Sequence, residues 1–201
     1  MRLSVAAALC LSVAAVEGAE GTSRKIDLRT KEGIQTVKAD WRYADVKIVE
    51  AVGKAPDGRP NKTYNYEPNA TNVVKSDFDD SKWELVDPLT LKNPRGGGQI
   101  CFGWYRTKIT IPADIPAGKK VFFQTIVDDY GEVWVDGKLP RKPGDSGGPV
   151  VAGFNAANRV ELKDVKPGKT YLIAVFAING PISATPGNWL FLREAFLEVV
   201  D

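Results

Sequence analysis

The chain has 201 residues, which suits one folded domain, because a single hydrophobic core usually takes about 100 to 200 residues. Its 27 Lys and Arg against 25 Asp and Glu leave a formal charge of +2, so we expect neither nucleic acid nor a membrane as partner. The chain has no histidine, which excludes Ser-His-Asp and Cys-His catalysis and zinc sites that need imidazole. The composition therefore favours a binding domain over an enzyme.

Residues 1–19 have the pattern of a secretory signal peptide. Arg2 precedes the apolar run Leu3–Val16, and small residues follow it as a cleavage zone. The run is shorter than the about 20 residues that span a bilayer. We therefore expect a secreted or periplasmic protein whose folded domain occupies residues 25–201.

From Trp41 onward, apolar and β-branched runs alternate with clusters of Gly, Pro and Asp, and helical periodicity is absent. The expected strands are Trp41–Val49, Cys101–Ile111, Lys120–Val127, Glu132–Val135, Arg159–Leu162, Tyr171–Ile178 and Trp189–Val200. The stretch Gly53–Lys75, rich in Pro, Asn, Thr and Lys, is expected to be a long surface loop. Strands at this spacing without crossover helices predict an all-β, antiparallel β-sandwich.

Two local patterns make sharper predictions. Asp136-Gly137 follows a strand-like run and predicts a tight turn in which both residues have positive φ. In the last strand, alternation predicts one buried and one wet face. The buried face would carry Trp189, Phe191, Ala195, Leu197 and Val199, and the wet face Glu194 and Glu198.

The segment Gly144–Pro149 reads Gly-Asp-Ser-Gly-Gly-Pro, as in the nucleophile loop of chymotrypsin-like proteases. Ser146 would need an imidazole to accept its proton, and the chain has none. A serine–lysine pair with Lys142 would need a desolvated lysine, which so polar a segment does not favour. We interpret the segment as a glycine-rich connection between strands.

Two pairs of adjacent carboxylates, Asp79-Asp80 and Asp128-Asp129, raise the question of glycoside hydrolysis. Neighbours on a strand point to opposite faces, so neither pair forms a catalytic dyad alone, and turn or cap roles are the simpler interpretation. Asp128 and Asp129 also suit a ligand loop, because they end a strand beside Tyr130. No cofactor is expected, although a structural calcium ion stays open because Asp oxygens suit it.

Sugars bind by stacking on aromatic rings while Asp, Asn and Arg side chains hydrogen-bond their hydroxyl groups. Trp104 and Trp134 lie within alternating strands and are expected in the core, whereas Tyr64 and Tyr66 adjoin turns. Further polar candidates are Arg106, Asn179 and Asn188. The residues predicted to bind a ligand are Asp129, Tyr130, Asn155, Arg159 and Trp189.

Three segments, Phe78–Trp83, Gly103–Arg106 and Val127–Lys138, occur in an order that resembles a known family. They read Phe-Asp-Asp-Ser-Lys-Trp, Gly-Trp-Tyr-Arg and Val-Asp-Asp-Tyr-Gly-Glu-Val-Trp-Val-Asp-Gly-Lys. Together they resemble the sugar-binding, galactose-binding-like jelly-roll domain of glycoside hydrolase family 2 enzymes.

A closer likeness is to the jelly-roll module attached to secreted gluconolactonase-type β-propellers. It is carried by Trp41–Tyr43, Gly153–Arg159 and Ile178–Ser183, and extends over roughly Lys25 to Asp201. The resemblance implies a jelly roll of about eight strands or more, usually non-catalytic, that assists carbohydrate recognition or packs against a catalytic partner.

Three functions follow from these observations. The leading one is a secreted, non-catalytic carbohydrate-binding or accessory domain. The second is a protein-interaction module that docks on a separately encoded gluconolactonase or glycosidase. The third is a glycoside or lactone hydrolase that depends on Asp128 or Asp129.

Overall fold

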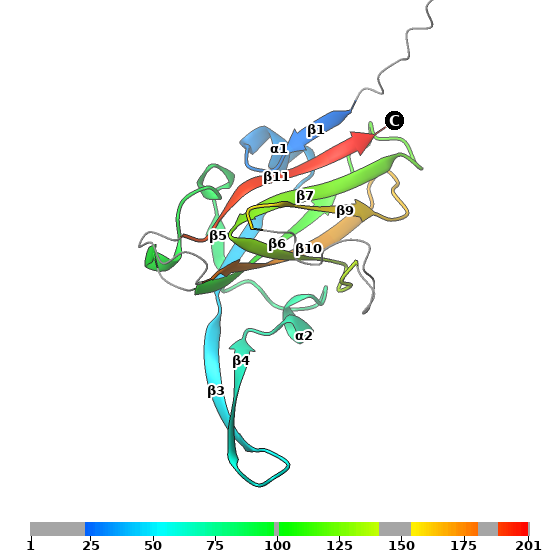
Figure 1. Ribbon diagram of the computed structural model, residues 1–201. Coiled ribbons are helices and arrows are strands. Elements are labelled where there is room, and N and C mark those ends of the chain that lie inside the picture. The colour runs from blue at the N-terminus through cyan, green and yellow to red at the C-terminus, as the bar shows by residue number, and fades with distance from the viewer. Residues whose placement is uncertain (1–22, 99–100, 141–153, 181–188, 201) are drawn as a thin grey trace, which may run out of the picture.

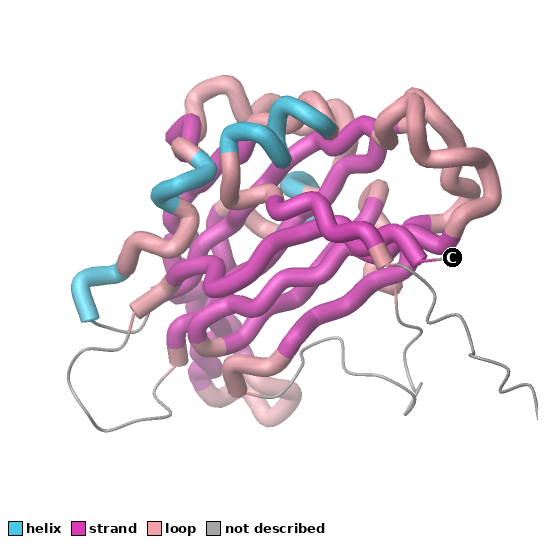
Figure 2. The backbone as a smooth tube through the Cα atoms, turned by 90° about the horizontal axis from the view of Figure 1, so that it is seen from above, coloured by secondary structure: helices cyan, strands magenta, loops and turns pink. Residues whose placement is uncertain are grey.

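Two antiparallel sheets stacked on each other form the body of the computed structural model, which describes residues 23–98, 101–140, 154–180 and 189–200 (Figure 1). One sheet has four strands in the order β1-β11-β7-β9, and the other has five in the order β5-β2-β6-β10-β8. Seen from above, the strands run side by side and the loops gather at their ends (Figure 2). The predicted all-β sandwich is confirmed.

The strands of the four-stranded sheet are β1 (Arg24–Asp27), β7 (Lys120–Asp128), β9 (Ala157–Leu162) and β11 (Phe191–Val200). Those of the five-stranded sheet are β2 (Trp41–Asp45), β5 (Glu84–Val86), β6 (Cys101–Thr110), β8 (Tyr130–Val135) and β10 (Thr170–Asn179). A separate hairpin consists of β3 (Lys47–Lys54) and β4 (Pro60–Glu67). The short helices are α1 (Lys31–Thr36), α2 (Ala70–Val73) and the 3-10 turns η1 (Pro88–Thr90) and η2 (Gly96–Gly98).

Helix α1 was not anticipated, although it has a local start signal. The Thr30 hydroxyl accepts a hydrogen bond from the Gly33 amide at 3.0 Å, which satisfies one of the free N–H groups of the first turn. Because the helix has only six residues, less than two turns, its sequence is too short for a helical repeat of apolar residues to be recognised.

The segment around the β3–β4 hairpin corrects two predictions. The expected strand Trp41–Val49 is divided at Val46 into β2 and β3, and much of the expected loop Gly53–Lys75 consists of β4 and α2. The overlooked signal is Asp57-Gly58, where Gly58 has a φ of 81° and the Ala55 amide bonds the Arg59 carbonyl at 2.8 Å. The polar composition of β4 suits a ribbon that is open to water.

The β3–β4 hairpin, which we call the arm, extends away from the sandwich (Figure 1). It is paired along its whole length, from Lys47 opposite Glu67 to Lys54 opposite Pro60. Near its tip Val52 is 73% exposed. At its base Tyr66 packs on Phe102, with ring centroids 5.5 Å apart.

The main core lies between the two sheets and is built from alternate residues of their strands. Members from the four-stranded sheet include Val121, Phe123 and Leu197, and Ile109 and Val175 come from the five-stranded sheet. All of these are fully buried, as expected when one face of each sheet is removed from water.

A second apolar cluster covers the outer face of the five-stranded sheet. Trp104 is 1% exposed there, and its indole N–H donates to the Pro68 carbonyl at 2.9 Å. Val73 and Phe78 pack over the same cluster, and Trp134 lies partly buried in it. The prediction that Trp104 and Trp134 belong to the core is therefore confirmed, in a layer outside the sandwich itself.

Arg106 fastens this outer layer to the sheet. It is 1% exposed, and it donates to the Val73 carbonyl at 3.0 Å, to the Lys75 carbonyl at 2.6 Å and to the Asp80 carboxylate. The sequence left Arg106 as a candidate for sugar contact. The structure places it under the α2 segment, so its guanidinium has a structural role.

The last strand contains a bulge that alters its predicted faces. The register of β11 against β7 shifts between Leu192 and Glu194, so one extra residue is accommodated there. Leu192 is therefore fully buried, whereas Phe191 is only partly buried and Trp189 is 38% exposed. The prediction that Trp189 and Phe191 lie on the buried face is wrong.

For the three other apolar residues the prediction is confirmed. Ala195, Leu197 and Val199 are buried in the main core. The tight turn is also confirmed, since Asp136 and Gly137 have φ values of 49° and 74°.

Two sequence predictions lie outside the described residues, namely the signal peptide at 1–19 and the segment Gly144–Pro149. In the part of the chain that is described, no helix has the length and apolar character needed to cross a membrane.

Candidate functional site

One end of the sandwich gathers the candidate residues, and we call it the loop end. The pairing of the strands defines this end by three pairs of opposite residues. They are Asn179 and Cys101, Ile178 and Tyr130, and Phe191 and Asp128. Strands β7 and β10 finish there, and β6, β8 and β11 begin there. Residues that follow or precede these strands in the sequence therefore meet in space.

Asp128 and Asp129 lie where the chain crosses from the four-stranded sheet to the five-stranded sheet. They end β7 and precede β8, and they are 8% and 1% exposed. The Asp129 amide donates to the Ile178 carbonyl at 3.1 Å, and its Oδ2 accepts the Gly180 amide at 3.2 Å. These bonds hold the Asp129 carboxylate against the end of β10.

Arg193 reaches Asp128 from the bulge of β11. Its Nη2 lies 2.8 Å from Asp128 Oδ2, and its guanidinium carbon lies 5.4 Å from the Phe191 ring centroid. Burial raises the pKa of Asp128, as does the neighbouring Asp129 carboxylate, which favours the protonated form of Asp128, and Arg193 opposes this rise. The sequence analysis missed Arg193, because only the bulge directs it toward Asp128.

Three asparagines lie at the same end of the sandwich as the two carboxylates. The backbone N–H of Asn155 donates to the backbone carbonyl of Asp129 at 2.9 Å, and Asn155 has a φ of 51°, a conformation that asparagine tolerates. Asn158 and Asn179 are 6% and 0% exposed at the ends of β9 and β10. The structure thus brings Asp129 and Asn155 together as predicted, and adds Asn158, which the sequence analysis missed.

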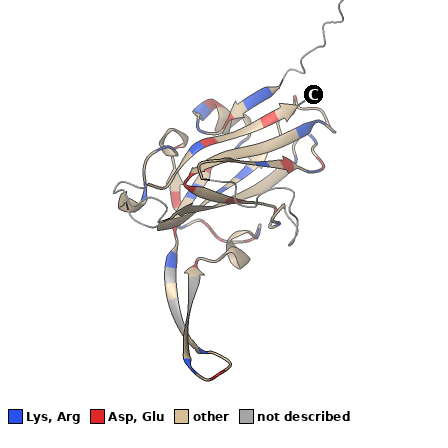
Figure 3. Cartoon of the chain, viewed as in Figure 1, with Lys and Arg blue, Asp and Glu red and all other residues tan. Residues whose placement is uncertain are grey.

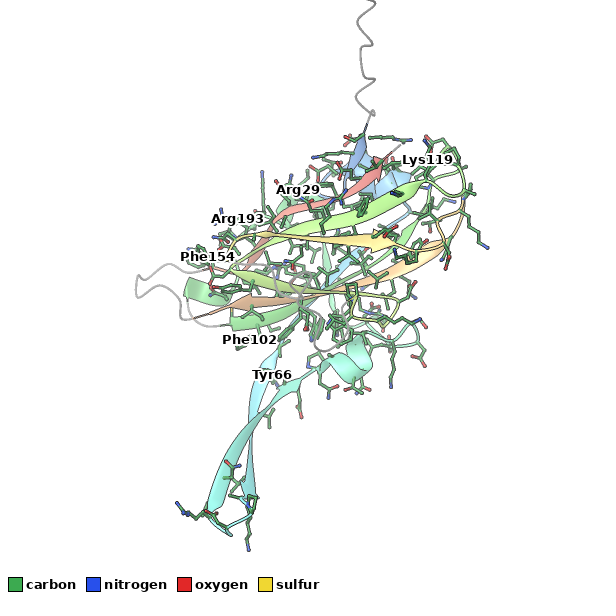
Figure 4. The ribbon with its side chains drawn as sticks, turned by 45° about the vertical axis from the view of Figure 1, so that its right-hand side comes forward. Arg29, Tyr66, Phe102, Lys119, Phe154 and Arg193 are labelled. Carbon is green, nitrogen blue, oxygen red and sulfur yellow. The ribbon has the colours of Figure 1, made fainter. Side chains whose placement is uncertain are left out.

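Aromatic rings lie at the rim of the loop end. The ring centroids of Tyr130 and Phe154 are 6.1 Å apart in an edge-to-face arrangement, and Phe154 is 54% exposed. Figure 4 shows Phe154 and Arg193 at the same end of the sandwich. Trp189 is two residues before Phe191, whose register partner is Asp128, so its exposed indole belongs to this end as well.

Arg159 does not join this group. Its Nη2 pairs with Glu198 Oε2 at 2.8 Å, and its guanidinium carbon lies 3.4 Å from the Phe122 ring centroid on the outer face of the four-stranded sheet. Its register partner is Gln124, four residues before Asp128 on β7. Basic and acidic residues are interspersed over the strands (Figure 3), which suits such cross-strand pairing.

The other aromatic and polar candidates also lie apart. Tyr64 and Tyr66 belong to β4 in the arm, and Asn188 is outside the described residues. Inside the sandwich, the Arg95 guanidinium carbon lies 4.0 Å from the Tyr43 ring centroid. Burial raises the pKa of the neighbouring Cys101 thiol, so this cysteine is a poor nucleophile.

Within the described residues, Asp, Glu and Cys side chains do not gather in threes as a cation would require. The structural calcium ion that the sequence left open therefore stays a prediction.

The pair formed by Glu84 and Arg95 predicts a pH dependence of stability. Both Arg95 Nη atoms lie 2.7 Å from the Glu84 carboxylate, and these hydrogen bonds lower its pKa below the usual 4.5. The stabilisation is therefore full above pH 4.5 and is lost as the pH falls through the lower folded-state pKa. Because Glu84 is half exposed, we expect Glu84→Gln to cost about 1 kcal/mol or less at neutral pH.

Urea unfolding of the wild type and Glu84→Gln at about pH 7 and about pH 3 measures this effect. We expect the difference between the two proteins to vanish at the lower pH. A difference of the same size at both pH values would show that the carboxylate charge is irrelevant.

No protein-family model matches this sequence, and no curated protein matches it either. Solved structures do match. A β-glucuronidase of Bacteroides uniformis superposes with a TM-score of 0.56 at 15% identity, over 89% of this chain and 18% of that chain. A calcium-binding mutant of Bacteroides uniformis β-glucuronidase 2 gives a TM-score of 0.52 at 16% identity, again over 89% and 18%.

The chain therefore spans less than a fifth of the length of these enzymes. Identities this low establish the fold alone. Within that limit, the family 2 resemblance carried by Phe78–Trp83, Gly103–Arg106 and Val127–Lys138 agrees with the structure. The chain has an antiparallel β-sandwich fold that superposes on a part of these two β-glucuronidases.

Proposed function

We propose that this chain is a non-catalytic accessory domain that binds a saccharide at the loop end, in a secreted or periplasmic protein. The likeness to a part of β-glucuronidases supports the class of ligand. The signal-like pattern of residues 1–19 supports the location.

The observation that carries the proposal is the meeting of rings and polar groups at one end of the sandwich. Phe154 and Trp189 are 54% and 38% exposed, so each offers an accessible ring face to the apolar side of a sugar. Asp128, Arg193 and Asn155 lie beside them and supply both donors and acceptors. Few other groups are needed for a weak saccharide site.

The arrangement of the carboxyl groups argues against hydrolysis. A glycosidase places two carboxyl groups about 5 to 9.5 Å apart on either side of the scissile bond. Asp128 and Asp129 are instead adjacent in the sequence, and each is engaged within the protein: Arg193 binds the Asp128 carboxylate, and the Gly180 amide donates to the Asp129 carboxylate. Turnover of an aryl glycoside or a lactone by the purified chain, abolished by Asp128→Asn, would contradict this proposal.

Calorimetric titration with a panel of mono- and oligosaccharides tests saccharide binding. We expect Trp189→Ala and Tyr130→Ala each to weaken binding about tenfold, the effect of losing one ring contact of about 1.4 kcal/mol. Tyr66→Ala is the matched control, because it removes a 41% exposed ring from the base of the arm. The proposal fails if no sugar gives heat, or if all three variants bind alike.

The arm favours docking on a separately encoded gluconolactonase or glycosidase as a second candidate function. An isolated two-stranded ribbon is only marginally stable in water, and among the described strands β3 and β4 pair only with each other. Replacing residues 49–65 by a short turn should abolish co-elution with such an enzyme while leaving the sandwich folded. Unchanged co-elution would exclude the arm as the docking element.

A further inference from the structure

A cavity of about 540 Å³ lies on the open side of the sandwich, between the edge strands β8 and β9. The cavity and the loop end lie at opposite ends of β8: Val135, the last residue of the strand, lines the cavity, and Tyr130, the first residue, lies at the loop end. The length of β8 separates these two positions by about 17 Å, at roughly 3.3 Å per residue. The cavity is therefore distinct from the proposed saccharide site, and its volume is within the range of small-molecule pockets.

The floor and walls of this cavity are largely apolar. Val135, Leu139, Pro140, Val160 and Tyr171 contribute to its lining. The Tyr171 hydroxyl donates to the Lys163 carbonyl at 2.7 Å, so the phenol is already satisfied. Burial raises the pKa of Tyr171 to about 12, so this wall adds no negative charge at neutral pH.

Lys169 places an ammonium group at the wall of the cavity. Its side chain is 26% exposed, and its Nζ donates to the Lys163 carbonyl at 2.8 Å and lies 4.6 Å from the Tyr171 ring centroid. The nearest paired carboxylate, that of Asp164, is 4.0 Å away and 94% exposed. The ammonium has three donors, and a carbonyl takes one of them, so two remain for a ligand.

Lys138 is a second ammonium group at the cavity that could bind a ligand. The Glu161 carboxylate is bound by the Lys163 ammonium, and Asp136 Oδ1 accepts the Leu172 amide at 2.8 Å. Lys138 is exposed at the rim, and its side chain forms no ion pair with any described residue. Asp136 and Glu161 are therefore engaged by neighbouring groups, whereas Asp164, the third acid of the lining, is 94% exposed and lies 4.0 Å from Lys169 Nζ. With respect to the described residues, Lys138 and Lys169 keep donors for a ligand.

We propose that this cavity binds an amphipathic organic anion, with an aromatic or alicyclic body on the apolar floor and a carboxylate or sulfonate held by Lys169 and Lys138. A charge-assisted hydrogen bond to Lys169 Nζ fixes the anionic end. Contact with Val135, Leu139 and Val160 holds the body by removing apolar surface from water.

Fluorescence titration of the folded chain with 1-anilinonaphthalene-8-sulfonate tests the proposal, because this probe combines both chemical features. We expect saturable binding at one site. Lys169→Met should weaken it about tenfold or more, as expected for the loss of a charged hydrogen bond, and Lys138→Gln about threefold. Lys166→Gln is the matched control, because this exposed lysine is close in sequence but does not line the cavity.

A neutral probe of the same shape, N-phenyl-1-naphthylamine, separates the charge requirement from apolar contact. We expect it to bind about tenfold or more weakly than the sulfonate. Thermal unfolding of every variant establishes that binding is measured on folded protein. If Lys169→Met does not fold, Leu139→Trp, which fills the cavity, should abolish binding instead.

Three results would overturn the proposal: no saturable fluorescence with the folded wild type, equal binding by Lys169→Met and Lys166→Gln, or equal affinity for the neutral probe. The saccharide titration at the loop end is independent of all three, so either proposal can fail alone.

Discussion

Arg106→Ala is expected to lower the free energy of unfolding by about 3 to 5 kcal/mol. Arg106 is 1% exposed, and the substitution removes the donors to the Val73 and Lys75 carbonyls and to the Asp80 carboxylate. The Val73 carbonyl would then be left buried without this donor, and the partly buried Lys75 carbonyl and Asp80 carboxylate would lose theirs, which costs more than the ion pair itself contributes. Urea unfolding followed by tryptophan fluorescence measures the loss.

Arg24→Ala is the matched control for this experiment. Arg24 forms an ion pair with Asp114 at 2.6 Å, with side chains 47% and 62% exposed, so we expect a loss of about 1 kcal/mol or less. If both variants lose the same stability, burial of the guanidinium has no special role. Arg106→Lys should recover little, because one ammonium group cannot reach three acceptors in the geometry of a guanidinium.

Gly103→Ala is expected to cost about 2 to 3 kcal/mol, because overpacking of a filled core is not relieved by small shifts. A Cβ at this position would lie 2.6 Å from Cε2 and 2.7 Å from the hydroxyl of Tyr43. That ring cannot move freely, since it is 4% exposed and its hydroxyl donates to Asp45 Oδ1 at 2.7 Å. The expected result is a lower urea midpoint with an unchanged slope.

A double-mutant cycle with Tyr43→Leu isolates the cause. Leucine lacks the ring atoms that the new methyl group would meet, so Gly103→Ala should cost much less in the Tyr43→Leu background. Additive losses would show that the cost has another origin, such as the strand conformation of Gly103.

These two positions explain part of the family resemblance. The motif Gly103–Arg106 has a glycine where Tyr43 crosses β6, a tryptophan in the outer layer and an arginine that holds Asp80. Asp80 itself belongs to the motif Phe78–Trp83, so the two motifs are joined by one ion pair. Two of the three motifs that carry the resemblance are thus mainly structural.

The candidate site was predicted less completely than the fold. Asp129, Tyr130 and Asn155 meet at the loop end, and Trp189 lies at the same end of the sandwich. Arg159 lies on another face, and Asn158 and Arg193 were missed. Residue type and closeness to a turn identify candidate binding groups, but they do not say which turns lie at the same end of a sheet.

Alternation along the sequence was sufficient to determine the all-β class, the positions of most strands and the burial of Trp104, because the period of two is a local property of each strand. Strand order, the bulge that directs Arg193 to Asp128, and the cavity beside Lys169 were decided only by the tertiary structure. The physical reason is that these features depend on backbone pairing between segments far apart in the chain, whose energies a local pattern does not contain.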